Sequence, residues 1–460
     1  MSGLTSILNI GNEALNTSQT ELNTTAHNIA NANTPGYTRQ TVDTQASLPV
    51  ETPYGYLGTG VEVTGIQGVR NAYVNEQVTN LNSDLSQANI NQQTLTSIGG
   101  IFNETATSTG GLTAQLNAFF SAMQTLSQSP EDSGLRQNVL QAGINVATTF
   151  NSLNSQLQNV KYQVSQQIGS DVNQINTLAG TIANINKELM ANAGTSRNSS
   201  DLQDQMNNAI NQLSNLVNVK VVTDSNGVMN VTAGGAVLVA AGNAYKFSMT
   251  QTTSGITVGR SDSSVPATVS SGELAGLINS FDTQIPAYAS QLDGIAATFA
   301  KIINTFNNAG YTLSTNASSP TQGGDFFQGT TAGTIQVSQN IISNLNNIAA
   351  SSSGAPGDGQ NAAAMGNVLN APVMANGQSI INGYEALVNQ IGTDSQNANN
   401  SVQTIQLQQN QMQAFQSSIS GVSLNQELTN MIQYQHSFEA AAKVITTADA
   451  MYQTIIGMVP

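Results

Sequence analysis

Apolar residues near the two ends of the chain follow the alternating spacing of three and four that is typical of coiled-coil helices. At the amino end the pattern runs through Leu4, Leu8, Gly11, Leu15, Ser18, Leu22, Thr25 and Ile29. At the carboxyl end it runs through Met431, Tyr434, Phe438, Ala441, Ile445, Ala448, Tyr452 and Ile455. Residues at this spacing lie on one face of a helix. We therefore predict an amphipathic helix at each end, each needing a partner to cover its apolar face.

The start of the last helix and the end of the first carry their own signals. Ser423 and Gln426 have the spacing of a capping box, with Leu424 and Leu428 in the first turns that follow. The first helix runs into Asn31-Ala32-Asn33-Thr34-Pro35-Gly36-Tyr37. Proline excludes the preceding residue from the helical region, and Pro-Gly suits a type II turn. The first helix is thus expected to end near Asn33, where the chain turns.

The middle of the chain alternates between helical and strand-like patterns. After a small extended connector up to residue 70, helical spacing returns from Val74, and Ser129-Pro130-Glu131 is typical of a helix start. We expect one very long helix, or two in line, over 131–193, and further helices over 201–217, 272–309 and 376–418, with a kink or break at Pro286. Two β-branched runs around Asn226-Gly227 predict a hairpin.

These patterns define the expected fold class, which is mainly α with a β insertion. The terminal helices pair as a coiled coil, the long helices form a rod-like domain, and the β domain faces outward. The expected divisions are 1–72 with 419–460 for the terminal helices and connector, 73–218 with 271–310 and 376–418 for the long-helix domain, 219–270 for the β domain, and 311–375 for a loop-rich outer excursion.

Composition narrows the function further. Charged residues make up 8% of the chain, the net charge is −15, and there is no Cys. Without a basic cluster to neutralise phosphates, nucleic acid is not an expected partner. Without Cys, disulfides and thiolate metal sites are excluded. The start lacks the pattern of a cleavable signal peptide, and no apolar run is long enough to cross a membrane, so membrane insertion is not expected.

No residue pattern indicates catalysis or a cofactor. The two histidines, His27 and His436, lie on the end helices without a metal-site spacing around them. Glu131-Asp132 is explained by the first turn of a helix. Gly58-Thr59-Gly60 and Gly357-Asp358-Gly359 lack the strand, helix and further glycine of a phosphate loop. We therefore predict no catalytic, metal or cofactor-binding residues.

The paired heptads remain, and they leave two interpretations open. The end helices close the fold of a single chain as an intramolecular coiled coil, or they pack against copies of themselves and relatives in an assembly, folding as they bind. The small and hydroxylic residues in the first seam favour the second interpretation slightly.

At this point the chain resembles a known family. Asn28 to Tyr37, directly after an amphipathic helix, resembles the signature of bacterial flagellar axial proteins of the rod, hook and hook–filament junction. Residues 111–140, 201–222 and 271–327 resemble the flagellar hook-associated protein 1 family. The chain departs from that family in having Asn425-Gln426 where acidic residues are common, and in a shorter outer region, which puts a second outer domain in doubt.

The resemblance implies a secreted structural subunit at the distal end of the hook, exported unfolded through the flagellar type III apparatus with an export chaperone. Its expected partners are copies of itself in a ring, the hook protein and a second hook–filament junction protein. The alternatives are a rod or hook axial protein, or a secreted adhesin-like binding protein. The residues expected to form the axial turn are Asn31, Asn33, Thr34, Pro35, Gly36 and Tyr37. Those expected to carry assembly are Leu4, Leu8, Leu15, Leu22, Ile29, Leu424, Leu428, Met431, Phe438, Ile445, Tyr452 and Ile455.

Overall fold

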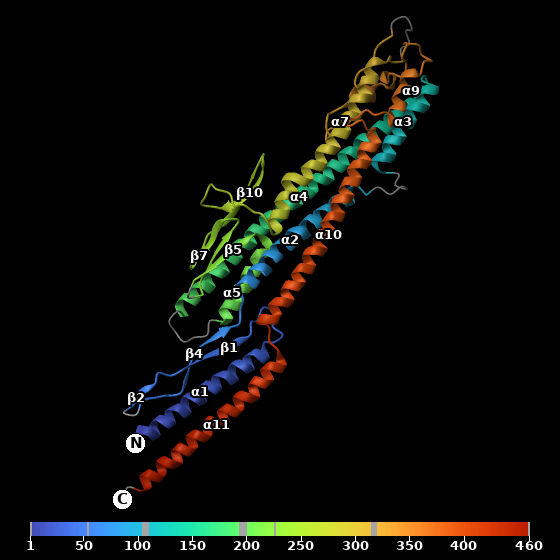
Figure 1. Ribbon diagram of the computed structural model, residues 1–460. Coiled ribbons are helices and arrows are strands. Elements are labelled where there is room, and N and C mark those ends of the chain that lie inside the picture. Colours follow the sequence, from blue (N-terminus) through green and yellow to red (C-terminus); the bar gives the residue numbers. More distant parts are fainter. Residues whose placement is uncertain are drawn as a thin grey trace.

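The computed structural model describes residues 2–52, 55–103, 110–192, 200–224, 227–313 and 320–458. The molecule is elongated, with both chain ends at one extremity and a bundle of long helices running to the other (Figure 1). A group of strands projects from the side of the bundle (Figure 1). The predicted fold class, mainly α with a β insertion and paired terminal helices, is confirmed.

The terminal part pairs the first and last helices and adds a β ribbon. Its elements are α1 (Ser2–Ala30), β1 (Gln40–Ala46), β2 (Val50–Thr52), β3 (Gly55–Leu57), β4 (Val61–Gly68) and α11 (Leu424–Gly457). β1 pairs with β4 and β2 pairs with β3, both antiparallel. The segment expected as an extended connector is thus a ribbon that folds back along α1 (Figure 1), because each alternating run supplies the backbone partners of the other.

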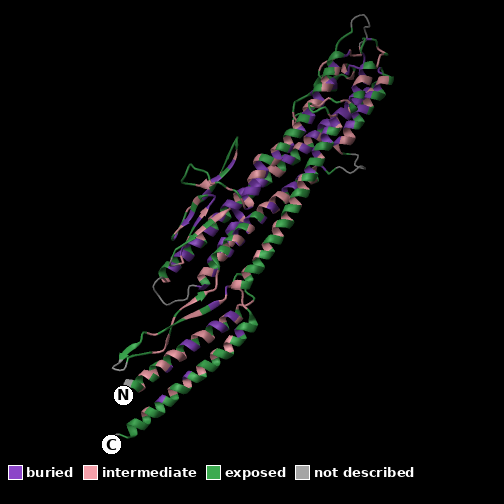
Figure 2. Ribbon diagram, viewed as in Figure 1, coloured by how far each residue is buried: buried purple, intermediate pink, exposed green. Residues whose placement is uncertain are grey.

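The long-helix bundle is assembled from segments far apart in the sequence. Its helices are α2 (Ala72–Ile101), α3 (Leu112–Gln128), α4 (Ser133–Asn192), α5 (Ser200–Leu216), α6 (Glu273–Asn279), α7 (Ile285–Ala309) and α10 (Ile380–Ser420). The long helix predicted over 131–193 is confirmed as a single helix of 60 residues, α4. Its apolar stripe joins those of its neighbours in one continuous hydrophobic core, which Figure 2 shows as buried segments along the bundle.

The predicted start of α4 is wrong by one turn. Ser129 is the C-cap of α3, Pro130 lies in the turn, and the helix begins at Ser133. The Asp132 carboxylate accepts a hydrogen bond from the backbone N–H of Gly134 at 2.7 Å. A carboxylate in this position satisfies an N–H group that the first helical turn leaves without a partner.

Pro286 does not interrupt its helix. A π-helical segment, Ser280–Gln284, joins α6 to α7 and places Pro286 within the first two positions of α7. Because proline lacks an N–H and its ring collides with the carbonyl four residues earlier, the wider π turn lets the helix continue past it.

The interface between α2 and α10 is unusually polar. Three pairs of side-chain amides cross it, namely Gln92 with Asn399 at 2.5 Å, Asn82 with Gln409 at 2.6 Å, and Asn75 with Gln416 at 2.8 Å. Steps along α2 match equal steps backwards along α10, so the helices are antiparallel and in one register. Much of α10 beyond Ile391 is exposed or half-buried (Figure 2).

The β domain is a four-stranded antiparallel sheet, in the order β5–β6–β7–β8, with a separate hairpin. The sheet strands are β5 (Val219–Thr223), β6 (Met229–Ala233), β7 (Ala236–Ala240) and β8 (Asn243–Ala244), and the hairpin strands are β9 (Phe247–Thr252) and β10 (Gly255–Arg260). The predicted pairing of β5 with β6 is confirmed, with Gly227 at φ +80°. Asn226 lies outside the described residues.

Asparagines on α4 hold the β domain to the bundle. The Asn186 side chain accepts from the backbone N–H of Met229 at 2.9 Å and donates to its carbonyl at 2.8 Å. Asn176 does the same for Phe247, at 2.7 and 2.9 Å. A side-chain amide presents one donor and one acceptor in the arrangement of a strand backbone, so each asparagine pairs with a strand edge as a neighbouring strand would.

The segment 320–375 covers the far end of the bundle. Its elements are β11 (Phe327–Gln328), β12 (Gln336–Val337), α8 (Gln339–Ser343), a 3₁₀ turn (Leu345–Asn347), α9 (Gln360–Asn367) and a second 3₁₀ turn (Val368–Asn370). Phe326 and Phe327 are fully buried and stack edge-on or tilted against Phe119. Although short of regular structure, the segment shares the hydrophobic core of the long helices.

Candidate assembly site: the terminal helix pair and its joint

The terminal helices meet along the face that their heptads predict, and the small residues allow the closest approach. Gly11, Ser18 and Thr25 are buried on α1. A Cβ added to Gly11 would lie 2.7 Å from Cγ1 of Ile445 on α11. The glycine in the first heptad is thus a point at which a larger side chain of α11 fits.

Two contacts fix the register of the pair. Gly11 lies against Ile445, and the Asn28 side chain donates to the buried Glu427 carboxylate at 3.1 Å. Residue numbers that increase along α1 are thus matched by numbers that decrease along α11, so the two helices of one chain are antiparallel (Figure 1).

The residues expected to carry assembly separate into two groups. On the seam, partly buried, are Leu4, Leu8, Leu15, Leu22, Ile29, Met431, Phe438, Ile445 and Tyr452. Leu424, Leu428 and Ile455 are instead about half exposed on α11. The pair thus covers its central seam and leaves apolar side chains at its flanks in solvent.

The predicted capping box at Ser423 is not formed. Ser423 is the N-cap residue of α11, but its side chain makes no cap hydrogen bond. The buried Glu427, in the first turn, turns to Asn28 of α1. This start of the helix is therefore fixed by its partner helix rather than by a local cap.

The Pro-Gly turn follows the predicted geometry. Gly36 has φ +78°, and the N–H of Tyr37 donates to the carbonyl of Thr34 at 3.2 Å, as in a type II turn with proline first and glycine second. Regular helix ends at Ala30, three residues before the predicted Asn33, and turns cover the interval. A Cβ on Gly36 would overlap the Asn208 side chain of α5, so glycine also permits the turn to lie against the bundle.

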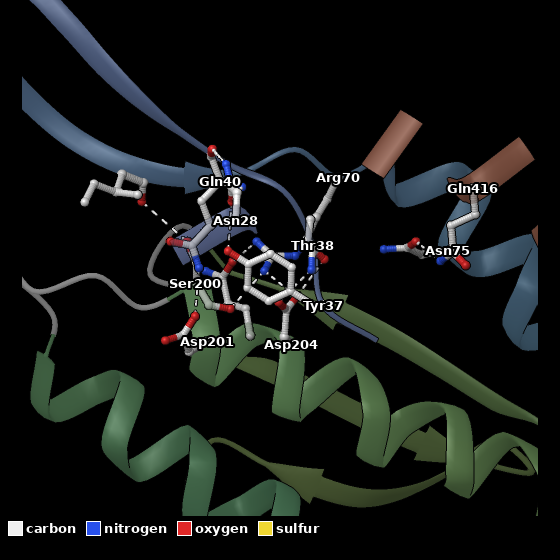
Figure 3. Close-up of polar contacts among 12 residues, drawn as sticks. Asn28, Tyr37, Thr38, Gln40, Arg70, Asn75, Ser200, Asp201, Asp204 and Gln416 are labelled. Carbon is white, nitrogen blue, oxygen red and sulfur yellow. Dashed lines mark hydrogen bonds and ion pairs between the residues drawn. The ribbon is translucent and has the colours of Figure 1, made fainter. Parts of the chain in front are cut away.

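Tyr37 points back to α1 and defines a proton arrangement there (Figure 3). Its hydroxyl lies 2.8 Å from Oδ1 of Asn28 and 3.1 Å from Nδ1 of His27. Because a phenol carries one proton and gives it to Asn28, Nδ1 of His27 must be the donor in the second contact. Burial, with the nearby carboxylates of Asp201, Asp204 and Glu427, raises the pKa of Tyr37 above its usual range, so the phenol keeps its proton.

Asn28 ties the helix to the ribbon through one amide. Its Oδ1 accepts from the N–H of Gln40 and its Nδ2 donates to the carbonyl of Gln40, both at 2.9 Å. Asn28 is 1% exposed and also bonds to Tyr37 and Glu427. One side chain therefore joins α1, the turn, β1 and α11.

A second cluster, the Asp204 network, joins this terminal part to the bundle (Figure 3). The carboxylate of Asp204 on α5 accepts from the N–H and hydroxyl of Thr38, at 2.9 and 2.7 Å. It also pairs with the Arg70 guanidinium at 2.7 Å. Arg70 donates further to Gln203 at 2.7 Å, and Gln40 donates to Asp201 at 2.7 Å. The start of α5 therefore holds the chain that directly follows the axial turn.

Sequence patterns missed the roles of Asn28, Thr38, Gln40, Arg70 and Asp204. Asn28 and Asp204 lie in stretches that resemble the family, but no spacing links the five residues to one another. They converge from the end of α1, from β1 and the chain next to β1 and β4, and from α5. The one available signal was that basic residues are rare, since the chain has only 11 Lys and Arg. Arg70 is one of them, and it lies beside the buried Asp204 carboxylate.

The described residues contain no cluster of three or more His, Cys, Asp or Glu side chains able to hold a metal ion. In the same described part of the chain, no helix is both long and apolar enough to cross a membrane. The site is therefore described by packing and hydrogen bonding alone.

Comparison with known proteins decides the family. The sequence model of the flagellar hook-associated protein FlgK helical domain matches residues 95–327. Flagellar hook-associated protein 1 of Bacillus subtilis is 32% identical, over 98% of this chain and 97% of that protein. The chain belongs to the flagellar hook-associated protein 1 family.

Further comparisons agree with this family. The Salmonella typhimurium protein of the same name is 28% identical over 70% of this chain and 59% of its own length. The structure of the flagellar hook junction protein FlgK from Burkholderia pseudomallei has a TM-score of 0.65 at 16% identity, over 75% of this chain and all of that one, which shows a shared fold. The resemblance noted in the sequence is confirmed, and the hook-associated protein 1 family is one of structural flagellar proteins rather than enzymes.

The ends of this family member match a wider group. Residues 8–38 match the flagella basal body rod protein model, and residues 413–458 match the C-terminal model of the basal body rod FlgEFG proteins. These two matches coincide with α1 plus its turn and with α11. The helix pair therefore lies within the segments that match rod proteins, and the middle of the chain, with the β domain, lies within the segment that matches the hook-associated helical domain.

Proposed function

We propose that this protein is a structural subunit of the junction between hook and filament, and that its terminal helices carry its self-assembly. The observation that carries the proposal is the division of the matches. The ends match rod proteins, while residues 95–327 match the hook-associated family. Such a chain combines the terminal helices of an axial subunit with a middle part that matches the hook-associated family.

The geometry supports a different role for each part of the molecule. The antiparallel pair of α1 and α11 forms the axial core, with the expected turn residues Asn31, Asn33, Thr34, Pro35, Gly36 and Tyr37 setting its angle to the bundle. The Asp204 network holds this angle because it bonds Thr38, the residue directly after the turn, to α5. The long helices form an outer tube layer, and the β domain faces away from it.

The partners follow from this position. The subunit is exported unfolded through the flagellar type III apparatus, with an export chaperone, and assembles as a ring between the hook protein and a second junction protein. The absence of Cys and the low charge of the chain are compatible with threading an extended chain through a channel.

Charge placed in the terminal seam tests the assembly role. Leu15→Asp with Leu22→Asp introduces two carboxylates into the partly buried seam and is expected to abolish filament growth, while the bundle stays folded. Asn16→Asp with Asn23→Asp is the matched control, since it adds the same charges to the exposed side of α1. Normal filaments in the first variant would refute the proposal.

Electron microscopy of cells lacking the gene tests the position in the flagellum. Complete hooks without filaments, with filament protein lost to the medium, are the expected result. Missing hooks would indicate a rod or hook subunit instead, and normal filaments would overturn the proposal altogether.

A further inference from the structure

A cleft lies beside the Asp204 network, where the axial turn meets α2, α5 and the end of α10. Its volume is about 180 Å³, and most of the side chains that line it are polar. Figure 3 shows some of them, namely Tyr37, Thr38, Arg70, Asn75 and Gln416. The joint between the terminal part and the bundle is thus only partly filled by protein, and we call this space the joint cleft.

The hydrogen bonds of α5 change along one line of the helix. Gln203, Asn207 and Asn211 are four residues apart, so their side chains lie above one another. Gln203 accepts from the Arg70 guanidinium at 2.7 Å. Asn207 and Asn211 line the joint cleft, and within the described part of the chain their side chains have no hydrogen-bond partner. The start of α5 is therefore bonded directly to the terminal part, whereas these two amides, one and two turns further along, are not.

The end of α10 lines the same cleft and lies outside the hydrophobic core. Ile391 is the last buried residue of α10, a helix that the structure describes throughout. Near the cleft, Gln416 is bonded to Asn75 of α2 at 2.8 Å. A bond between side-chain amides exchanges for bonds to water at little net cost, whereas interlocked apolar side chains resist a shift. The end of α10 is therefore able to move relative to α2 and α5.

Arg70 contributes a buried donor that no protein group accepts. Its two NH2 groups bond to Asp204, Gln203 and the carbonyl of Ser200. Its Nε is shielded from solvent and has no hydrogen-bond partner among the described residues. Burying an N–H group without a partner is unfavourable, and such groups usually bond to ordered water. Because Arg70 lines the cleft, a slight opening lets a water molecule reach its Nε, so hydration favours the open position.

Charge and size both favour water as the occupant of the joint cleft. The Arg70 guanidinium on its wall is already paired with the Asp204 carboxylate at 2.7 Å, so the two charges cancel there. The remaining polar side chains on the wall are amides and hydroxyls, which donate and accept as water does. A water molecule occupies about 30 Å³ in the liquid, so the volume of about 180 Å³ corresponds to about six molecules.

We propose that the joint cleft holds a cluster of water molecules and makes the joint a hinge. The Asp204 network is the pivot, because it bonds the start of α5 directly to the terminal part. The end of α10 moves with the terminal part, since the N–H of Arg39 donates to the carbonyl of Ser420 at 2.9 Å. Closing the hinge brings this end toward Asn207 and Asn211 and expels water, and opening admits it. The direct bonds set the resting angle, and the cleft allows a tilt from it.

The hinge deepens the proposed function and rests on it for its purpose. If α1 and α11 form the axial core, a core that tilts against its bundle lets one subunit fit between two different partner proteins. The motion itself belongs to the single chain and is measured without assembly. Its failure is therefore separate from failure of the junction role, which the filaments of the gene deletion report.

Energy transfer between two fluorescent dyes measures the hinge in the full-length chain, which has no Cys of its own. Gln19→Cys on α1 and Asn80→Cys on α2 carry the dyes, since both residues are exposed and lie on the two sides of the joint. Sucrose lowers the activity of water and is excluded from protein surfaces. If about six waters leave on closing, lowering the water activity by about a tenth shifts the hinge equilibrium about twofold toward the closed position. The transfer efficiency is therefore expected to change steadily with sucrose.

Removing the free amides of the cleft provides the matched comparison. Asn207→Leu with Asn211→Leu deletes two groups that hold water, so the response to sucrose is expected to disappear. Gln205→Leu with Gln212→Leu makes the same kind of change on the exposed side of α5 and is expected to respond as the parent does. A constant transfer efficiency in the parent, or an equal response in the cleft variant, would overturn the hinge.

A crystal structure of the unaltered chain, at a resolution that shows water, provides a second measurement that needs no variant. Ordered water molecules bonded to the side chains of Asn207 and Asn211 are the expected result. A cleft closed by direct contacts between α5 and the end of α10 would contradict the proposed water cluster.

Discussion

Replacing Asp204 by Ala removes the centre of the joint between the terminal part and the bundle. The carboxylate accepts two hydrogen bonds from Thr38 and pairs with Arg70. Its side chain is 9% exposed and that of Arg70 is 16% exposed, so water screens the pair little. Breaking a buried charge pair costs about 3–5 kcal/mol. Arg70 keeps its bonds to Gln203 and to the carbonyl of Ser200, which favours the lower figure, about 3 kcal/mol.

This cost is expected to appear as local opening rather than global unfolding. A change of about 3 kcal/mol raises the opening equilibrium of the joint about 150-fold. Hydrogen exchange measures it at the amides of Thr38 and Gln40, whose N–H groups are held by Asp204 and Asn28. Amides in the buried middle of α4 report on the bundle and are expected to keep their protection.

A graded control separates this role from a general effect of charge removal. Asp201→Ala deletes the same charge from the same helix but loses one hydrogen bond, from Gln40 at 2.7 Å. About 1 kcal/mol, or roughly fivefold faster opening, is expected. Unchanged exchange at Thr38 in Asp204→Ala, or equal effects of the two substitutions, would refute the assignment of Asp204 as the centre of the joint.

Three further predictions concern stability. Burial raises the pKa of Asp171 to about 7 from 3.8, so between these values the folded chain holds a proton that the unfolded chain has lost. The free energy of unfolding is therefore expected to fall as pH rises from about 4 to 7. In urea titrations Asp171→Asn is expected to raise the free energy of unfolding by about 2 kcal/mol at pH 8 and to leave it unchanged at pH 4. Gly11→Val is expected to cost about 1–3 kcal/mol by collision with Ile445, and Gly3→Val, which meets no atom within 4 Å, to be nearly neutral in thermal melts that follow the terminal helices. Arg136→Met removes the three hydrogen bonds that the buried guanidinium donates to the carbonyls of Pro130, Leu345 and Ile348. It is expected to lower the free energy of unfolding by about 3 kcal/mol in urea titrations, so an unchanged midpoint would contradict it.

Periodic packing was the part of the structure that the sequence could predict. Heptads located the terminal helices and their seam, and a single long stripe located α4, because buried faces repeat with the period of the helix. The Pro-Gly turn was predictable since its two residues restrict their own backbone. These features depend on neighbours within one segment, which a sequence displays directly.

The joint could not be predicted because it has no period. Thr38, Gln40, Arg70 and Asp204 meet from segments separated by more than a hundred residues, and each is an ordinary polar residue where it stands. Ser423 shows the opposite failure. It has a correct local signal, but the tertiary contact of Glu427 with Asn28 replaces the predicted cap.

The amides of this chain have a consequence for its tolerance of salt. The side-chain amides of Asn28, Asn176 and Asn186 each make two hydrogen bonds to a strand backbone. Further amide pairs cross the interface of α2 with α10. Neutral dipoles are barely affected by mobile ions, whereas exposed ion pairs lose most of their attraction once the screening length falls to a few ångströms, near 1 M salt. These amide contacts are therefore expected to keep nearly the same strength from dilute buffer to about 1 M salt, a property suited to a part that works outside the cell.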